Sequence, residues 1–462
     1  MAKISSSSSR FLRVFGIPFG IAALTLVTAG PTLAANTGAE APAQNAPAIV
    51  AVSDSISIHK DETVLSFEFN RAAPLNAYVL ANPDRVIIDL PEINFQVAPP
   101  DLAQAHRNHD SNGLASVSKK QLTAPSLVRN FRFGLMGQGK SRIVIDLAAP
   151  VRLVHAEMKK ISHGDPARLE IALQPASRAE FMKAAALASS KIVPDEATQP
   201  AQAVVDSGKP VIVLDPGHGG IDSGAINTKA NSEEKNLTLA FANRLRQQLE
   251  ASGQYSVIMT RDSDHYVSLS ERVKIGREAH AKLFISLHAD SLAGGGGVHG
   301  ATVYTLSNKA SDIAAERMAA EENSVDSDAG LVTQNAEPKD VNDILNELML
   351  RETRAYSHLF AESVAKTWGP AEQMSKRPLR SASFVVLKDP EVPSVLIELG
   401  YISSRRDLAN LTSDTWREKT ARTFVTAINA FFATQIGAVG SVQKIANSVD
   451  PTSVPAVTKT TH

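Results

Sequence analysis

The sequence predicts two folded domains: a small all-β sandwich followed by an α/β domain whose mainly parallel sheet is flanked by helices. At 462 residues the chain is longer than one hydrophobic core usually serves. Over residues 49–175, short segments alternate apolar and polar side chains, which is typical of half-buried strands. Over residues 210–436, apolar runs alternate with amphipathic helical patterns, which indicates a parallel sheet with helices packed on it.

The N-terminal segment predicts export. Three basic residues precede a mostly apolar stretch, and small residues ending at Ala35 follow it, which is the order found in a signal peptide over residues 1–35. Residues 36–48 are rich in Ala, Pro, Asn and Gln and are expected to form a flexible lead. We therefore expect a periplasmic protein with no stable membrane anchor after removal of the signal.

Composition excludes some classes of site. The chain contains no cysteine, so neither a disulfide nor a thiolate metal ligand is available. The formal net charge is −1, which argues against nucleic acid as a partner. Histidine and carboxylate side chains are then the candidate ligands for a metal.

Within the first domain, strands are expected near residues 64–69, 85–90, 128–133, 142–147 and 167–172. The second and fourth of these segments have nearly the same sequence, RVIIDL and RIVIDL. Two similar halves favour a sandwich of symmetric origin over residues 49–175. Residues 176–209 combine a short helical pattern with several prolines, and predict an interdomain linker.

In the second domain, over residues 210–436, the patterns predict six strands and five helices. The strands are expected near 211–215, 256–260, 283–288, 301–306, 383–387 and 394–398. The helices are expected near 235–252, 268–281, 309–322, 340–367 and 413–433. The remaining residues, 437–462, are expected to be a disordered tail.

Two histidines and a glutamate stand at the ends of three of these strands. His218 lies in the glycine-rich segment DPGHGG directly after the first strand, His288 ends the third, and Glu398 ends the last. The glycines allow backbone conformations that a Cβ would forbid, so His218 is expected to be held rigidly. Because ligands of open α/β sheets bind at the carboxyl ends of the strands, these three side chains mark the expected site.

Imidazole and carboxylate together suit zinc, and catalytic zinc commonly has three protein ligands and one open position. A third ligand is therefore expected near His218. Glu233 and Glu234 both lie at the start of the helix near 235–252. Such a pair can supply a ligand, although an isolated pair more often only complements the positive end of the helix dipole.

Four motifs occur in order between residues 210 and 435: DPGHGG, EK before a helix, SLHAD, and PSVLIELGY. Together they resemble the zinc-dependent N-acetylmuramoyl-L-alanine amidases of the type 3 family. The resemblance implies that His218, Glu234 and His288 bind Zn²⁺ and that Glu398 is the catalytic residue. In such an enzyme Glu398 would take a proton from water and pass it to the leaving amine. The bond cleaved would be the amide between N-acetylmuramic acid and L-alanine in peptidoglycan.

The first domain resembles the AMIN domain that precedes many such amidases. This resemblance implies that it binds peptidoglycan and directs the enzyme to the division septum, where wall splitting separates the daughter cells. A β spacer without a ligand is the alternative, because no pocket residues stand out in the pattern.

The segment of about 307–354 is longer than one crossover helix needs. Resemblance to division amidases implies a regulatory insert whose helix covers the zinc until an activator, a LytM-like protein, pulls it away. An open zinc site attracts carboxylates, and the insert carries four candidates for this contact: Glu321, Glu322, Glu337 and Glu347. An apolar stripe on the second part of the insert would then offer the activator a binding face.

Two other functions fit parts of the pattern. A zinc peptidase acting on stem peptides would use the same metal ligands and differ in the bond that it cleaves. A non-catalytic peptidoglycan-binding division protein would have no need for His218, Glu234, His288 and Glu398 together, so the four residues favour an enzyme.

Overall fold

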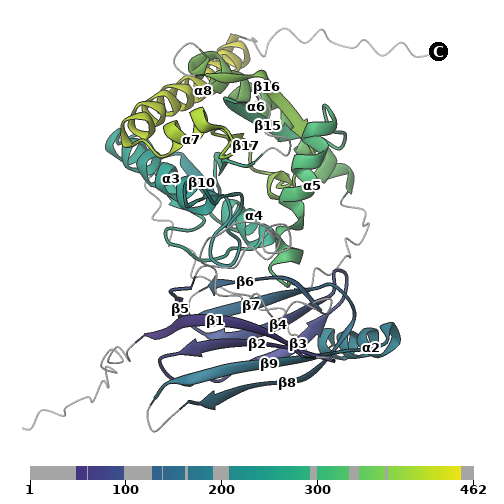
Figure 1. Cartoon of the computed structure of the whole chain (residues 1–462). Helices are drawn as coiled ribbons and strands as arrows, with labels where there is room; N and C mark the ends of the chain where they lie inside the picture. The colour runs from purple at the N-terminus through teal and green to yellow at the C-terminus, as the bar shows by residue number, and fades with distance from the viewer. Residues whose placement is uncertain are drawn as a thin grey trace, which may run out of the picture. The chain divides into compact units, whose positions relative to one another are not determined.

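The computed structural model describes residues 48–59, 61–97, 127–137, 139–161, 165–190, 208–291, 299–331, 343–369 and 373–448. The predicted signal peptide and nearly all of the flexible lead lie outside these residues. Figure 1 shows two folded domains, one all-β and one α/β. Among the described residues, no helix combines the length and the apolar character that a membrane span needs.

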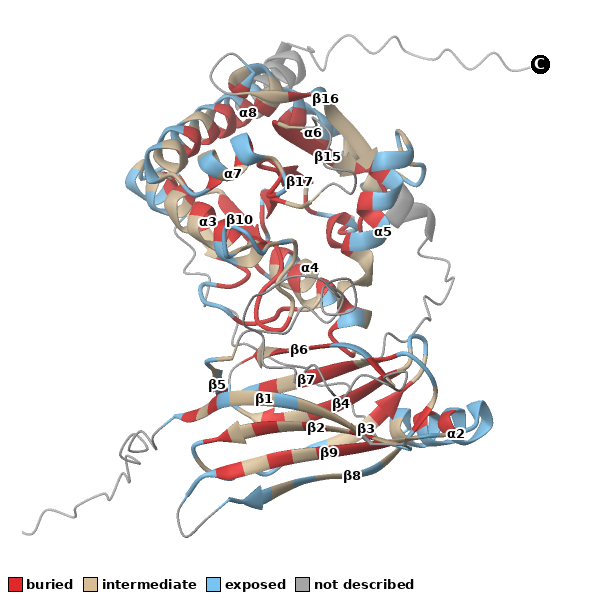
Figure 2. Ribbon diagram, in the orientation of Figure 1, coloured by how far each residue is buried: buried red, intermediate tan, exposed pale blue. Residues whose placement is uncertain are grey.

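The N-terminal domain is a β sandwich, as predicted. One sheet has the strand order β5-β1-β2-β9-β8 and the other the order β3-β4-β7-β6. The strands are β1 (Ile49–His59), β2 (Glu62–Phe69), β3 (Asn76–Leu80), β4 (Arg85–Pro91), β5 (Ile93–Phe95), β6 (Val128–Gly137), β7 (Lys140–Leu147), β8 (Val151–Lys160) and β9 (Ala167–Pro175). Buried and less buried residues alternate along β2 (Figure 2). Phe67 of that strand packs edge-on against Phe131 and Phe133 of β6.

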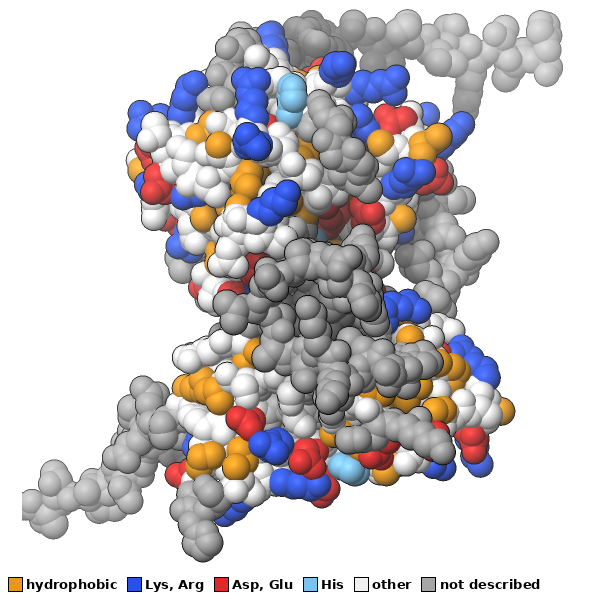
Figure 3. Space-filling view, viewed as in Figure 1, with side chains coloured by type: hydrophobic (Ala, Val, Ile, Leu, Met, Phe, Trp, Pro, Cys, Tyr) orange, Lys and Arg blue, Asp and Glu red, His pale blue; other side chains and the backbone are white. Residues whose placement is uncertain are grey.

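The two repeated segments are neighbours in the second sheet. Strands β4 and β7 pair antiparallel, so that Arg85 lies opposite Asp146 and Asp89 lies opposite Arg142. Arg142 donates a hydrogen bond of 2.6 Å to Asp89. Because each repeat carries arginine at one end and aspartate at the other, antiparallel pairing sets opposite charges face to face. Acidic and basic side chains both occur over the visible face of this domain in Figure 3.

Helix α2 (Arg178–Ser189) packs on the sandwich. Ser177 caps its first turn and forms a capping box with Glu180. Phe181 and Ala185 of the helix are buried in the core of the β domain. The start of the predicted linker is therefore part of that domain, and residues 191–207 lie outside the described part of the chain.

The C-terminal domain contains a six-stranded sheet of order β13-β10-β14-β17-β15-β16. Adjacent strands run parallel except β15 and β17, which run antiparallel. The mainly parallel sheet is therefore confirmed. The strands are β10 (Val211–Pro216), β13 (Ser256–Met259), β14 (Leu283–His288), β15 (Ala301–Leu306), β16 (Met374–Ala382) and β17 (Ser394–Glu398), with a separate ribbon of β11 (Ile226–Asn227) and β12 (Ser232–Glu233).

Helices cover both faces of this sheet (Figure 1). One layer contains α3 (Glu234–Ala251), α6 (Asp343–Trp368) and α8 (Asp414–Ser448), with the short α7 (Arg405–Leu411) before α8. The other contains α4 (Leu269–Glu278), α5 (Ile313–Asp328) and the 3-10 helix η1 (Val385–Leu387). Ile212 and Leu214 of β10 face the first layer, whereas Val211 and Val213 face the second. Burial on both faces explains why residues 211–214 of β10 form a continuous apolar run.

The strand expected near 383–387 is wrong. Residues Val385–Leu387 form η1, and β16, directly before it, is the edge strand. Phe384 is fully buried by packing on Tyr304, not by pairing in the sheet. The sequence analysis did not predict β16 because the strand lacks an apolar run: it carries lysine, arginine and Pro378, residues that suit an edge strand.

Two helices extend further than expected. Helix α8 continues to Ser448, past the point near residue 437 where the sequence predicted disorder. Helix α5 spans Ile313–Asp328 instead of 309–322, so Glu322 lies within the helix and not at its end.

Candidate functional site

His218 lies in a tight turn directly after β10. Its φ of 62° is left-handed, a conformation that costs about 1–2 kcal/mol for a residue with a side chain. The ring nitrogen Nδ1 lies 2.8 Å from a carboxylate oxygen of Asp222. Because Asp222 occupies Nδ1, the other nitrogen, Nε2, is left to face the site, where it is buried and makes no hydrogen bond.

His288 and Glu398 come from the two strands beyond β10. Strand β14 lies between β10 and β17, and His288 is in register with Glu398 across the parallel pair. Gly217 packs so closely on the His288 ring that a Cβ at that position would collide with it. The carboxyl ends of three adjacent strands therefore bring the three predicted side chains to one edge of the sheet.

Glu234 is the first residue of α3 and is fully buried. One carboxylate oxygen accepts a hydrogen bond of 2.7 Å from the Ala289 N–H, and the other accepts one of 2.9 Å from the Ala225 N–H. Its neighbour Glu233 is partly exposed and lies 3.6 Å from the ammonium of Lys235. The structure thus distinguishes the two glutamates: Glu234 points into the site and Glu233 points away.

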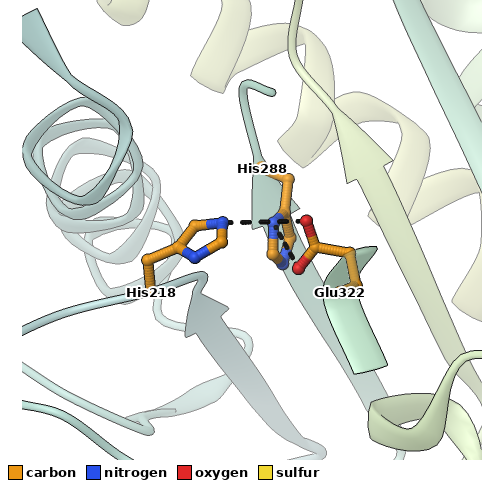
Figure 4. Close-up of side chains that lie close together, drawn as sticks. All are labelled: His218, His288 and Glu322. Carbon is orange, nitrogen blue, oxygen red and sulfur yellow. Dashed lines mark ion pairs between the residues drawn. The ribbon is translucent and has the colours of Figure 1, made fainter. Parts of the chain in front are cut away.

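Four side chains converge at this edge: His218, Glu234, His288 and Glu322 (Figure 4 shows the two histidines with Glu322). The Glu234 Oε1 atom lies 3.2 Å from His218 Nε2 and 3.4 Å from His288 Nδ1. The two carboxylate oxygens of Glu322 lie 3.7 Å and 3.3 Å from the same two nitrogens. All four residues are buried.

This donor set fits a tetrahedral metal ion. Bonds of about 2.0–2.2 Å to a common centre place tetrahedral ligand atoms about 3.3–3.6 Å apart, close to the distances found here. The facing nitrogens of His218 and His288 are buried without a hydrogen-bond partner, which is costly unless another group, such as a metal ion, takes their lone pairs. His218, His288 and Glu322 form a group that could hold a metal ion.

Charge in the site also favours a cation. Burial lowers the pKa of His288, but the carboxylates of Glu322 and Glu234 outweigh it and raise that pKa to about 10. Burial likewise opposes protonation of His218, yet Asp222 and Glu234 raise its pKa well above the usual value. The carboxylates around the two imidazoles thus favour a positive charge at this point, which a divalent ion would supply.

Glu322 reaches the site from α5. The buried face of this helix carries Ala315, Met318 and Ala319 toward the core and, one to two turns later, Glu322 and Asp326. The buried face of α5 is therefore apolar toward the N-terminus of the helix and acidic toward its C-terminus. Among the described carboxylates, Glu234 and Glu322 are the two that lie within 3.7 Å of both histidines.

Polar contacts of three residues hold α5 in this position. Asp312 caps its N-terminus and pairs with Arg380 over 3.0 Å. Asn323 donates to the Ser383 carbonyl and accepts from the Val385 N–H, both at 2.8 Å. Near the other end, Asp326 accepts hydrogen bonds from the Tyr266 hydroxyl at 2.6 Å and the Leu269 N–H at 3.0 Å. These contacts fix the rotation of the helix that directs Glu322 inward.

Glu398 is fully buried beside the ligand cluster. Its Oε2 accepts a hydrogen bond of 3.0 Å from the Asp290 N–H, and its Oε1 has no hydrogen-bond partner. Burial, with the nearby carboxylates of Glu234 and Asp290, raises the pKa of Glu398 well above its usual value. A carboxyl group with a raised pKa and one free oxygen can carry a proton near neutral pH.

The other predicted inhibitory glutamates are placed differently. Glu321 is exposed on α5, and no ion pair with either histidine is among its described contacts. Glu337 lies outside the described residues, as does the side chain of Glu347. Asp222 and Asp326 also contribute to the site, and the sequence analysis missed both. The position of Asp222, four residues after His218, is a sequence signal by which it could have been predicted.

Comparison with known proteins identifies the fold around this site. The family model described as N-acetylmuramoyl-L-alanine amidase matches residues 212–430. The N-acetylmuramoyl-L-alanine amidase AmiA of Escherichia coli K12 is 36% identical over 228 residues, which cover 49% of this chain and 77% of AmiA. The chain belongs to the type 3 N-acetylmuramoyl-L-alanine amidase family. This membership confirms the enzyme class that the four motifs predicted.

Similarity to an amidase extends beyond the amidase domain. The N-acetylmuramoyl-L-alanine amidase AmiC of Escherichia coli O6:H1 is 29% identical over 382 residues, which cover 80% of this chain and 87% of AmiC. Among solved structures, the amidase AmiC2 of Nostoc punctiforme is 26% identical, with a TM-score of 0.36, and the match covers 49% of this chain and 99% of that one. The match to AmiC is long enough to include part of the N-terminal β domain.

Proposed function

We propose that this amidase is a zinc enzyme that hydrolyses the amide between N-acetylmuramic acid and L-alanine in peptidoglycan. We place it in the periplasm at the septum, where this cleavage splits the wall between daughter cells. The observation that carries the proposal is the convergence of His218, Glu234 and His288 beside Glu398 at one sheet edge. The amidase names of the relatives support the choice of bond.

In this proposal His218, Glu234 and His288 hold the zinc ion. When bound, zinc supplies Lewis acidity that makes water a better nucleophile at neutral pH and polarises the substrate carbonyl. Asp222 keeps the His218 ring oriented through Nδ1, and the two backbone N–H groups on Glu234 keep its carboxylate oriented. Such outer contacts reduce the reordering that a ligand set needs when it binds its ion.

Glu398 would move the proton. Its free Oε1 accepts a proton from the attacking water, and the protonated carboxyl then gives it to the leaving amine of L-alanine. The hydrogen bond from the Asp290 N–H holds the other oxygen, so the carboxyl group keeps one orientation in both steps. The neighbouring carboxylates favour the protonated form that the second step requires.

The bond cleaved is the direct test of the proposed function. We expect purified sacculi digested with the zinc-loaded protein to release stem peptides that begin with a free L-alanine amine and to leave glycan strands without peptides. Mass spectrometry of the soluble fragments distinguishes these products from peptides cut within the stem, which a zinc peptidase would produce. Stem-internal cleavage alone would reject the amidase assignment.

We further propose that Glu322 keeps the enzyme inactive by occupying the position that water and substrate need. Its two oxygens contact both histidines, and contacts of Asp312, Asn323 and Asp326 hold α5 in place. An activator, a LytM-like protein by resemblance, would release α5 from the site.

Two further predictions stay untested. One is that the AMIN-like β domain binds peptidoglycan, and the other is that the apolar stripe of the insert, near residues 341–348, binds the activator.

Glu322→Ala is expected to raise activity measured without an activator. A contact to a charged group contributes about 1.5–3 kcal/mol, and each 1.4 kcal/mol shifts the ratio of closed to open enzyme tenfold, so an increase of roughly 10- to 150-fold is expected. Release of dye from labelled sacculi measures it. Glu321→Ala is the matched control, because it removes the same charge from the exposed side of α5. A zinc-loaded Glu322→Ala enzyme no faster than the parent would show that Glu322 is not the inhibitory group.

A further inference from the structure

Two buried arginines lie beside the His218 turn and take no part in the proposed chemistry. Arg261 follows β13 and is 1% exposed, and Arg272 lies on α4 and is 3% exposed. Water does not reach these guanidinium groups, so their N–H donors need acceptors within the protein. The identity of those acceptors shows which parts of the chain each arginine holds in place.

Arg261 connects the two segments that carry proposed metal ligands. Its Nε donates to the Pro216 carbonyl over 2.9 Å, and one terminal nitrogen donates to the Gly217 carbonyl over 2.9 Å. The same nitrogen donates to the Lys235 carbonyl over 2.7 Å. Pro216 and Gly217 directly precede His218, and Lys235 directly follows Glu234. One side chain therefore ties the turn after β10 to the first turn of α3.

Thr238 strengthens the same connection from the side of α3. Its hydroxyl lies 3.0 Å from the Gly217 carbonyl, which it can bond, and 3.2 Å from the terminal nitrogen of Arg261. The residue is fully buried. Arg261 and Thr238 thus form a link, here called the turn–helix link, between the His218 turn and the start of α3.

Arg272 holds the other side of the turn. It donates to the Pro216 carbonyl over 3.0 Å and to the His218 carbonyl over 2.9 Å. The same guanidinium pairs with the buried Asp215 over 2.6 Å. Carbonyl groups of three successive residues are therefore bound by arginine side chains, at the point where His218 takes its left-handed backbone conformation.

We propose that Arg261 is a positioning residue that holds His218 and Glu234 in the geometry of metal ligands before the metal binds. The inference rests on the proposed metal site and adds how the ligands of that site are held in place before the metal binds. If the ligands have the geometry that binds the ion for only a fraction of the time, the apparent affinity for the ion is reduced by that same fraction. The unfavourable φ of His218 makes such disorder the expected result when the turn–helix link is weakened.

The test is Arg261→Lys, which keeps the charge but replaces a planar fork of five donors by one ammonium group. We expect its zinc affinity to fall about 10- to 100-fold, measured by competition with a chromophoric chelator at a temperature where parent and variant are both folded. The absorption spectrum of the Co²⁺-substituted protein should change as well, and saturating zinc should restore most of kcat. Arg417→Lys is the matched control, because Arg417 also donates to a backbone carbonyl, that of Leu411, but at the start of α8.

Parental zinc affinity and an unchanged cobalt spectrum in Arg261→Lys would overturn the positioning role and leave the proposed function standing. If the parent protein itself bound no zinc, the proposed function would fail instead. Should Arg261→Lys not fold, Thr238→Val tests the same turn–helix link by removing the hydroxyl near the Gly217 carbonyl. A loss of zinc affinity in that variant is expected, and parental affinity would again overturn the proposal.

Discussion

Glu398→Gln is expected to retain zinc and to lower kcat by about 10²- to 10⁴-fold, the range typical of a general acid–base group. Glutamine preserves the shape of the side chain and can still accept the hydrogen bond from the Asp290 N–H, so the fold around β17 should persist. It cannot accept the proton of water or return one to the amine. Steady-state hydrolysis of a soluble muropeptide, with zinc content measured on the same sample, gives both quantities.

The matched control for this change is Glu391→Gln, an exposed glutamate shortly before β17. It makes the same chemical exchange without touching the site and should keep parental kcat. A Glu398→Gln enzyme that turned over at nearly the parental rate would move the proton-transfer role to another group. Loss of zinc from that variant would instead mean that Glu398 supports the metal site.

His218→Ala and His288→Ala are each expected to lose stoichiometric zinc, and with it essentially all activity. Each replacement removes one of two nitrogens that face the same point from adjacent strand ends, and the two remaining ligands form an incomplete set. Elemental analysis after dialysis against buffer without zinc measures the metal content. Circular dichroism at the same concentration establishes that the variant is folded.

His358→Ala serves as the control for both variants, because His358 lies on the exposed side of α6 and pairs only with Glu362 among the contacts described. It should keep one zinc ion per chain. Zinc retained at full stoichiometry in both His218→Ala and His288→Ala would contradict the proposed ligand set. Retention in one variant alone would remove that histidine from the set.

Much of the α/β domain could be predicted because its signals are local. Residues 211–214 before His218 are all apolar, as expected of a strand buried on both faces, and the glycines near His218 mark the turn. His288 and Glu398 follow similar runs, and the parallel order of the strands then places all three residues at one edge. Resemblance, not spacing, selected Glu234 over Glu233, and the structure gives the physical basis: only Glu234 receives two backbone hydrogen bonds inside the site.

What the sequence did not reveal depends on contacts between distant segments. Four glutamates of the insert were equal candidates for the proposed inhibitory contact, because nothing local indicates which of them faces the histidines. That choice is made by Asn323 and Asp326, whose partners lie about 60 residues away along the chain. The same holds for Arg261: in the sequence it is an ordinary charged residue after a strand, and only its carbonyl partners in the structure show what it connects.

The position of β17 in the sheet means that the central sheet can be completed only by a segment near the end of the chain. Strand β17 is among the last elements of the chain, yet it inserts between β14 and β15, so the central sheet stays in two pieces until the segment after residue 394 has emerged and paired. Helix α5 is synthesised earlier than β17 and carries Glu322. In chain order Glu322 therefore precedes Glu398, and under the proposed function a chain truncated before Ser394 would carry the proposed inhibitory glutamate without the proposed proton-transfer group.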